Sequence, residues 1–89
     1  MATKKVDRGI IYHTDGTMIL AVPSNGKKFM LEELQKAVGG YIQIVPNSSP
    51  ASYCNEEGLV YGLPYNAQAS KRFGVNLVGP VIERYKTEV

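Results

Sequence analysis

The sequence predicts a single α+β domain, in which a mostly antiparallel sheet of about five or six strands carries two short helices. Two segments support this prediction most directly. Residues 29–42 have the pattern of an amphipathic helix that ends at two glycines and leads straight into a strand. Residues 55–70 contain a tight turn, a strand and then a capped helix. The chain of 89 residues is long enough for one compact core and too short for two.

The N-terminal part of the domain is predicted to be a hairpin. Residues 1–8 are polar and charged, so we expect a flexible basic arm there, a domain over 9–86, and a tail at 87–89. Residues 9–14 are β-branched and aromatic enough to form the first strand. Asp15-Gly16 suits a two-residue hairpin turn in which both residues have positive φ. Residues 17–22 return as the second strand, with Met18, Leu20 and Val22 on one face.

The first helix is predicted over about residues 30–38. Leu31, Leu34 and Val38 recur at helical spacing and form one apolar stripe. The Gly39-Gly40 pair should end the helix in a left-handed residue and then allow a close approach of the backbone. A strand over residues 41–45 follows at once.

The second half of the chain is predicted to hold another hairpin, another helix and the last strand. A short strand over 52–54 turns at residues 55–58, and residues 59–61 are expected to return as its partner. Asn66 is a good N-cap for a helix that runs to Phe73, and Gly74 should end it. The last strand begins at Val81 and leads into a charged tail.

Composition excludes several classes of protein. The net charge is +2 and the basic residues are scattered, which argues against a nucleic-acid-binding protein. Cys54 is the single cysteine, so we expect a reducing compartment and a thiol that acts as a small buried hydrophobe. No apolar run is long enough to cross a bilayer, and the first residues do not have the pattern of a signal peptide. We therefore expect a cytoplasmic protein without membrane contact.

Several short motifs occur along this chain. They are Leu34-Gln35, Gly39-Gly40, Asn55-Glu56-Glu57-Gly58, Gly62-Leu63-Pro64-Tyr65-Asn66 with Ala69-Ser70, and Gly79-Pro80-Val81. As a set covering roughly residues 15–85, they resemble a small uncharacterised domain family found mainly in bacteriophages and mobile elements. The resemblance implies a phage-type accessory protein in the cytoplasm of an infected bacterial host, and it brings no catalytic residues. Two positions depart from the family pattern, because Met30 replaces a Ser or Thr helix cap and Gln43 replaces a frequent Glu.

The candidate binding site lies at the start of the second predicted helix. A helix N-terminus offers free backbone N–H groups that suit a phosphate or carboxylate, and basic and aromatic side chains follow nearby. The residues predicted to bind a ligand are Asn66, Gln68, Lys71, Arg72, Tyr65 and Tyr41. The bland interpretation is that Asn66 only caps its own helix. No metal site, phosphate loop or catalytic triad is evident, and no cofactor is expected.

These observations favour a non-catalytic protein that counters host defence by binding either a nucleotide signal or a host defence protein. Two alternatives remain open. The first is a nucleic-acid-binding regulator that uses the basic residues at 4–8, and the second is a small hydrolase that uses Glu56 or Glu57 with His13. Six tyrosines in a chain of this size also suggest tyrosine-rich sheet edges that favour a homo-oligomer.

Overall fold

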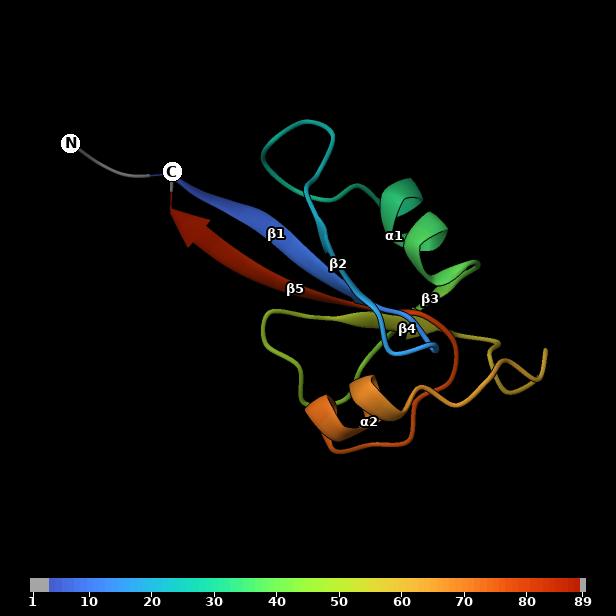
Figure 1. Ribbon diagram of the computed structural model, residues 1–89. Helices are drawn as coiled ribbons and strands as arrows, with labels where there is room; N and C mark the ends of the chain where they lie inside the picture. The colour runs from blue at the N-terminus through green and yellow to red at the C-terminus, as the bar shows by residue number, and fades with distance from the viewer. Residues whose placement is uncertain (1–3, 89) are drawn as a thin grey trace.

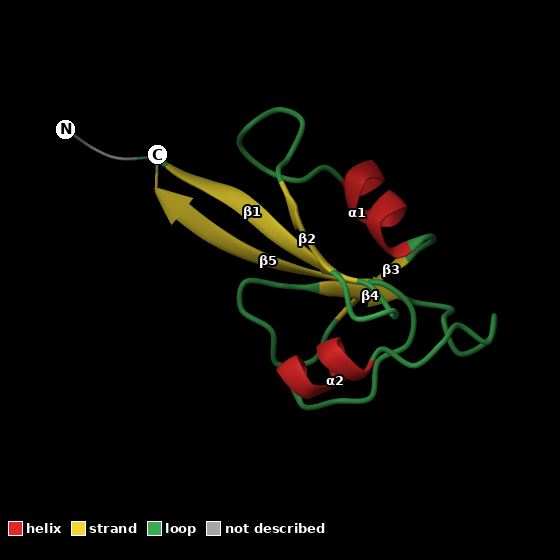
Figure 2. Cartoon of the chain, viewed as in Figure 1, coloured by secondary structure: helices red, strands yellow, loops and turns green. Residues whose placement is uncertain are grey.

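A computed structural model describes residues 4–88 and confirms the predicted α+β class (Figure 1). Its elements are β1 Lys5–Tyr12, β2 Met18–Ala21, α1 Leu31–Val38, β3 Ile42–Ile44, β4 Tyr53–Asn55, α2 Ala67–Phe73 and β5 Val81–Glu88. The five strands form one antiparallel sheet in the order β2-β1-β5-β4-β3. Figure 2 shows the two helices on opposite sides of this sheet.

The longest pairing joins the two ends of the chain. β1 and β5 pair over eight residues, from Lys5 opposite Glu88 to Tyr12 opposite Val81, and the ribbon they form extends away from the rest of the fold (Figure 1). The flexible arm predicted at 1–8 is therefore wrong for residues 5–8, and the tail predicted at 87–89 is strand through Glu88. The rest of the predicted arm and tail, residues 1–3 and 89, lies outside the residues that the structure describes.

A buried carboxylate explains why this terminal ribbon is ordered. Asp7 on β1 is almost fully buried and contacts Arg84 and Lys86 on β5, with its oxygens 3.2 Å and 2.5 Å from their nitrogens. It also accepts a hydrogen bond from the backbone N–H of Phe29. Burial alone would raise the pKa of Asp7, but the hydrogen bond and charge of Lys86, the Phe29 N–H and Arg84 outweigh it, so the pKa lies below its usual value.

The sheet buries both of its faces. Val81 and Ile82 are adjacent in β5 and point to opposite faces, as in any strand. Val81 packs into a cluster on the α2 side with Tyr12, Val45, Cys54, Ala69 and Leu77. Ile82 packs into a cluster on the α1 side with Phe29, Leu34 and Val38. Cys54 thus behaves as predicted, and burial raises the pKa of its thiol.

Both helices end as the sequence predicts. Gly39 and Gly74 adopt the left-handed conformation, at φ 79° and φ 72°, and close α1 and α2. Met30 precedes α1 and makes no side-chain cap, whereas Asn66 caps α2 by accepting a hydrogen bond from the Ala69 N–H. Within residues 4–88, neither helix has the length and apolar character needed to cross a membrane.

Two predicted turns differ from the structure. β1 ends at Tyr12, and the connection to β2 covers residues 13–17, because the Asp15 carboxylate accepts hydrogen bonds from the N–H and hydroxyl of Thr17. Of the two residues predicted to have positive φ, only Gly16 does. The strand predicted at 59–61 is also wrong. β4 already pairs with β3 on one edge and β5 on the other, so no edge remains for a further strand, and residues 56–62 form turns instead.

Candidate functional site

Asn66, at the centre of the predicted site, is part of the core. Its exposed fraction is 0%. Its side-chain amide donates to the carbonyls of Tyr12 and Gly79, both at 2.9 Å, and its side-chain oxygen accepts from the Ala69 N–H. Asn66 thus caps its own helix, as the bland interpretation expects, and its side-chain polar atoms already have partners within the protein.

The other residues predicted around α2 do not converge on one site. Arg72 makes a two-pronged contact with Glu83, which also accepts a hydrogen bond from Tyr12. Tyr65 and Lys71 are exposed and line a shallow hollow beside α2, without Gln68. Tyr41 lies elsewhere, next to the end of α1. The sequence prediction thus grouped side chains that the fold separates.

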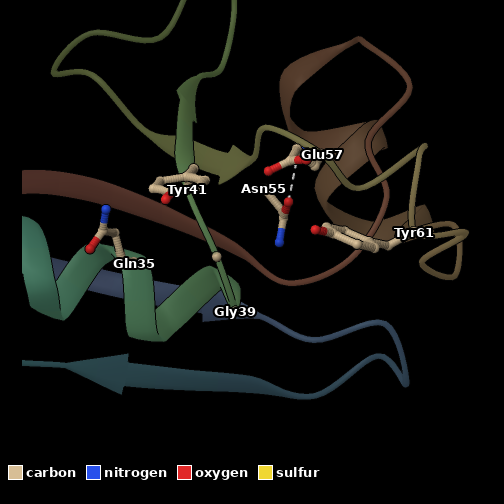
Figure 3. Close-up of a pocket in the computed structure, with 7 residues that line it drawn as sticks. Gln35, Gly39, Tyr41, Asn55, Glu57 and Tyr61 are labelled. Carbon is tan, nitrogen blue, oxygen red and sulfur yellow. Dashed lines mark hydrogen bonds between the residues drawn. The ribbon is translucent and has the colours of Figure 1, made fainter.

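A different pocket, of about 320 Å³, forms where three segments meet. Figure 3 shows the end of α1, the start of β3 and the loop after β4 around it. We call it the tyrosine pocket, and its lining residues are Gln35, Gly39, Gly40, Tyr41, Asn55, Glu57 and Tyr61. Of the residues predicted to bind a ligand, only Tyr41 belongs to it.

Asn55 builds the floor of the tyrosine pocket. It is almost fully buried, and its amide donates to the last-turn carbonyl of Val38 at 3.1 Å, while its oxygen accepts from the Glu57 N–H at 2.8 Å. The first bond satisfies a carbonyl that the end of α1 leaves without a helical partner. A Cβ at Gly40 would lie 2.9 Å from the Asn55 amide nitrogen. The expected close approach at the glycine pair is therefore real, and it places backbone against this side chain.

The walls of the pocket are held by backbone hydrogen bonds. The N–H groups of Gly39 and Gly40 both donate to the Gln35 carbonyl, and the Glu56 N–H donates to the Tyr41 carbonyl. On the far wall, the Tyr61 N–H donates to the Glu57 carbonyl, which winds the loop back on itself. These bonds fix the pocket before any ligand arrives, which lowers the entropic cost of binding.

The rim offers polar groups that the fold leaves free. Four side chains of the lining make no hydrogen bond to any other group within residues 4–88. They are Gln35, Tyr41, Glu57 and Tyr61. Tyr41 and Tyr61 are 64% and 68% exposed, so each presents a ring as well as a hydroxyl group. Side chains with this combination of apolar face and free polar group are typical of binding surfaces.

The charge of the pocket restricts its ligand. Among the described residues that line the pocket, Glu57 is the only charged one, and none is a lysine or an arginine. A phosphate or carboxylate buried here would meet a carboxylate and no cation, which is unfavourable. A flat, uncharged group with hydrogen-bond donors fits the rings and acceptors better.

The groups considered for hydrolysis are not assembled. Glu57 lines the tyrosine pocket, Glu56 lines a second hollow near Cys54, and His13 lines a groove between β2 and α1. Across residues 4–88, His, Cys, Asp and Glu side chains nowhere form a group of three or more suited to a metal ion. Of the basic residues proposed to track nucleic acid, Lys5 and Arg8 are part of β1, which is paired with β5 along its whole length.

Sequence reasoning missed most of this pocket for a physical reason. Gln35, Gly39-Gly40 and Asn55 to Gly58 were each recognised as parts of motifs, but each was interpreted locally, as a helix, a cap or a turn. The signal that could have found the pocket is that α1 leads directly into β3, which pairs with β4, so the ends of these segments must meet. Tyr61 gave no such signal, because it was placed in a strand that does not form.

The fold and the pocket define a small α+β domain in which backbone hydrogen bonds hold a polar and aromatic pocket. The chain belongs to the family described as a domain of unknown function (DUF3846), whose model matches residues 8–84. No curated protein and no solved structure matches the chain.

Proposed function

We propose that the protein is a non-catalytic binding protein that holds a nucleotide by its base in the tyrosine pocket. The observation that carries the proposal is the pair of exposed rings, Tyr41 and Tyr61, above a floor whose hydrogen bonds are already made. A base offers a flat face for the rings and amino or imino donors for the Glu57 carboxylate. Its phosphates would remain outside, because the pocket lining has no cation.

The proposal keeps the wider role that the family resemblance suggests. A phage-type accessory protein in the host cytoplasm could counter host defence by removing a nucleotide signal from solution. Sequestration of this kind needs affinity and abundance and no chemical step, which agrees with the dispersed positions of His13, Glu56 and Glu57. It moves the proposed ligand contacts from α2 to the tyrosine pocket.

The first test is native mass spectrometry of the protein with a panel of adenine and guanine nucleotides, linear and cyclic. Ribose 5-phosphate and inorganic phosphate are included as ligands without a base. We expect a stoichiometric adduct with at least one nucleotide and none with the two base-free compounds. An adduct with the base-free compounds, or none with any nucleotide, would contradict the proposal.

Matched tyrosine variants then locate the site. Removing Tyr41 or Tyr61 as Tyr→Ala should weaken binding by about 1–3 kcal/mol each, since an aromatic ring stacked on a base contributes about that much. The control is Tyr65→Ala, because Tyr65 is 54% exposed but lies beside α2, outside the pocket. Lys71→Glu is a second control for the α2 region. Loss of binding in the controls with retention in the pocket variants would return the site to α2.

A host defence protein is the second candidate ligand, and one observation favours it. Leu59 and Val60, next to the tyrosine pocket, are 83% and 80% exposed, which gives this loop an apolar surface suited to a protein contact. Capture of a host protein that Leu59→Lys abolishes, together with no nucleotide adduct, would favour this candidate over the first.

A further inference from the structure

β2 is an edge strand whose side chains offer little protection against pairing with another strand. It is the last strand on its side of the sheet, so its outward backbone N–H and C=O groups meet no other strand among residues 4–88. Residues 17–23 contain no charged side chain, and Met18, Ile19, Leu20 and Val22 are all at least half exposed. The face predicted to carry Met18, Leu20 and Val22 therefore lies in solvent.

The opposite edge of the same sheet shows what protection looks like. β3 is three residues long and carries the polar Gln43 at its centre, whereas β2 is four residues long and consists of apolar residues alone. A proline follows both strands at the same distance, Pro46 after β3 and Pro23 after β2, so the difference between the two edges lies in their side chains. β2 has a continuous register with β1, from Met18 opposite Tyr12 to Ala21 opposite Gly9, and no bulge interrupts it. Within residues 4–88, β2 is thus the more open of the two edges of the sheet.

We propose that β2 pairs with β2 of a second copy of this chain, giving a two-fold symmetric dimer with a continuous ten-stranded sheet. This inference is independent of the tyrosine pocket, which lies at the other end of the strand order. It also replaces the tyrosine-rich edge expected from the sequence, because β2 contains no tyrosine.

Symmetry restricts the register of such a dimer. Two antiparallel strands in one sheet are related by an axis perpendicular to the sheet, so each residue must pair with one that points to the same face. Residue numbers of a pair must then add to an even number. The register centred on Leu20, the most exposed residue of β2, satisfies this condition. It places Leu20 opposite Leu20 and Met18 opposite Val22 of the second copy.

Charge at the two ends of β2 favours the same antiparallel arrangement. Asp15 precedes the strand, whereas Lys27 and Lys28 follow it, and all three are exposed. In an antiparallel arrangement, the end of β2 that Asp15 precedes lies beside the end of the second copy's β2 that Lys27 and Lys28 follow. A parallel pairing would instead place like charges together at each end, which is unfavourable.

Oligomeric state tests the proposal directly. Sedimentation and native mass spectrometry over about a hundredfold range of concentration should show a monomer–dimer equilibrium. Leu20→Lys should weaken the dimer by about tenfold or more, because a lysine on an edge strand opposes strand addition. Leu59→Lys is the matched control, since Leu59 is as exposed as Leu20, at 83% against 75%, and lies far along the chain in a loop. Circular dichroism confirms that both variants fold.

Each outcome of these measurements either supports or overturns the proposed dimer. A wild-type protein that stays monomeric throughout would overturn the proposal. So would a dimer that Leu59→Lys dissociates and Leu20→Lys does not. A dimer weakened by salt and by Leu20→Lys alone supports it.

Cross-linking tests the register without relying on a destabilised dimer. In a Cys54→Ala background, Leu20→Cys should be joined to itself rapidly by a short bis-maleimide reagent, because the two side chains face each other across the axis. Leu59→Cys in the same background is the control and should remain uncross-linked. Equal cross-linking of the two variants would show random collision and contradict the paired edge.

Discussion

Asn66 and Asn55 are the same residue type in two regions of the molecule, and the fold uses them differently. Asn66 lies inside the α2 side of the core, with a side chain that makes three hydrogen bonds to backbone groups. Asn55 makes two such bonds and is 7% exposed, at the floor of the tyrosine pocket. The first region is sealed from solvent. The second is also held by side-chain hydrogen bonds, but it opens to solvent on one side.

The difference shows that a buried asparagine can either join segments inside the core or hold the floor of a surface pocket. In both regions the side chain satisfies the ends of neighbouring elements, the start of α2 in one case and the end of α1 in the other. What separates them is the surroundings, since Asn66 is fully buried in the core whereas Asn55 lines a pocket bordered by exposed tyrosines. Mutations in the two regions should therefore have different effects on folding and on binding.

The largest effect is expected in the sealed region. Asn66→Ala leaves the carbonyls of Tyr12 and Gly79 without their donor and removes the cap of α2, so it should lower the free energy of unfolding by about 3–5 kcal/mol. Urea unfolding monitored by circular dichroism measures this loss. The control is Asn76→Ala, because Asn76 is exposed and should cost less than about 0.5 kcal/mol. Similar losses for the two variants would mean that the region is not sealed.

Asp7 extends the comparison to a buried side chain that carries a charge. Its pKa is lowered in the folded state, so its contribution to stability is present above the unfolded-state pKa and is lost as pH falls through the folded-state value. The free energy of unfolding should therefore fall as pH is lowered from neutral into the acid range. Asp7→Asn should reduce stability at neutral pH by about 1–2 kcal/mol, allowing for the partial exposure of Lys86, and flatten the acid dependence. An unchanged pH profile in the variant would contradict this role.

At the open region, a substitution should affect folding and binding together. Gly40→Ala places a Cβ against the Asn55 amide and should cost about 1–2 kcal/mol by displacing that side chain from the Val38 carbonyl. The proposed nucleotide affinity should fall as well, because the floor of the pocket moves. In an Asn55→Ala background the same substitution should cost much less, since the clash is gone. Additive costs in this double-mutant cycle would show that the two residues do not act on each other.

Most local features of the fold could be predicted from the sequence. The glycines at 39 and 74, the cap at Asn66 and the apolar positions Leu34 and Val38 all lie where local patterns placed them. These features depend on residues only a few positions apart, so the chain specifies them within a single turn of helix or one short strand.

The errors share one cause, which is dependence on distant partners. Residues 59–61 have strand-like composition but do not form a strand, because β4 has no free edge. Residues 5–8 look like a solvated arm, yet Arg84 and Lys86, nearly eighty residues later, allow Asp7 to be buried. Leu31 belongs to the predicted apolar stripe of α1 but is exposed, because the sheet reaches only Leu34 and Val38.

The candidate site depended on tertiary structure more than the fold did. Sequence alone determined the α+β class, the two helices with their caps, and the absence of a long apolar segment. Only the tertiary structure decided that Asn66 is sealed, that Arg72 is occupied by Glu83, and that Tyr41 and Tyr61 border one pocket. Helix caps and turns are set by neighbouring residues, whereas a pocket is set by which distant segments pack together, and that arrangement follows from burial across the whole chain.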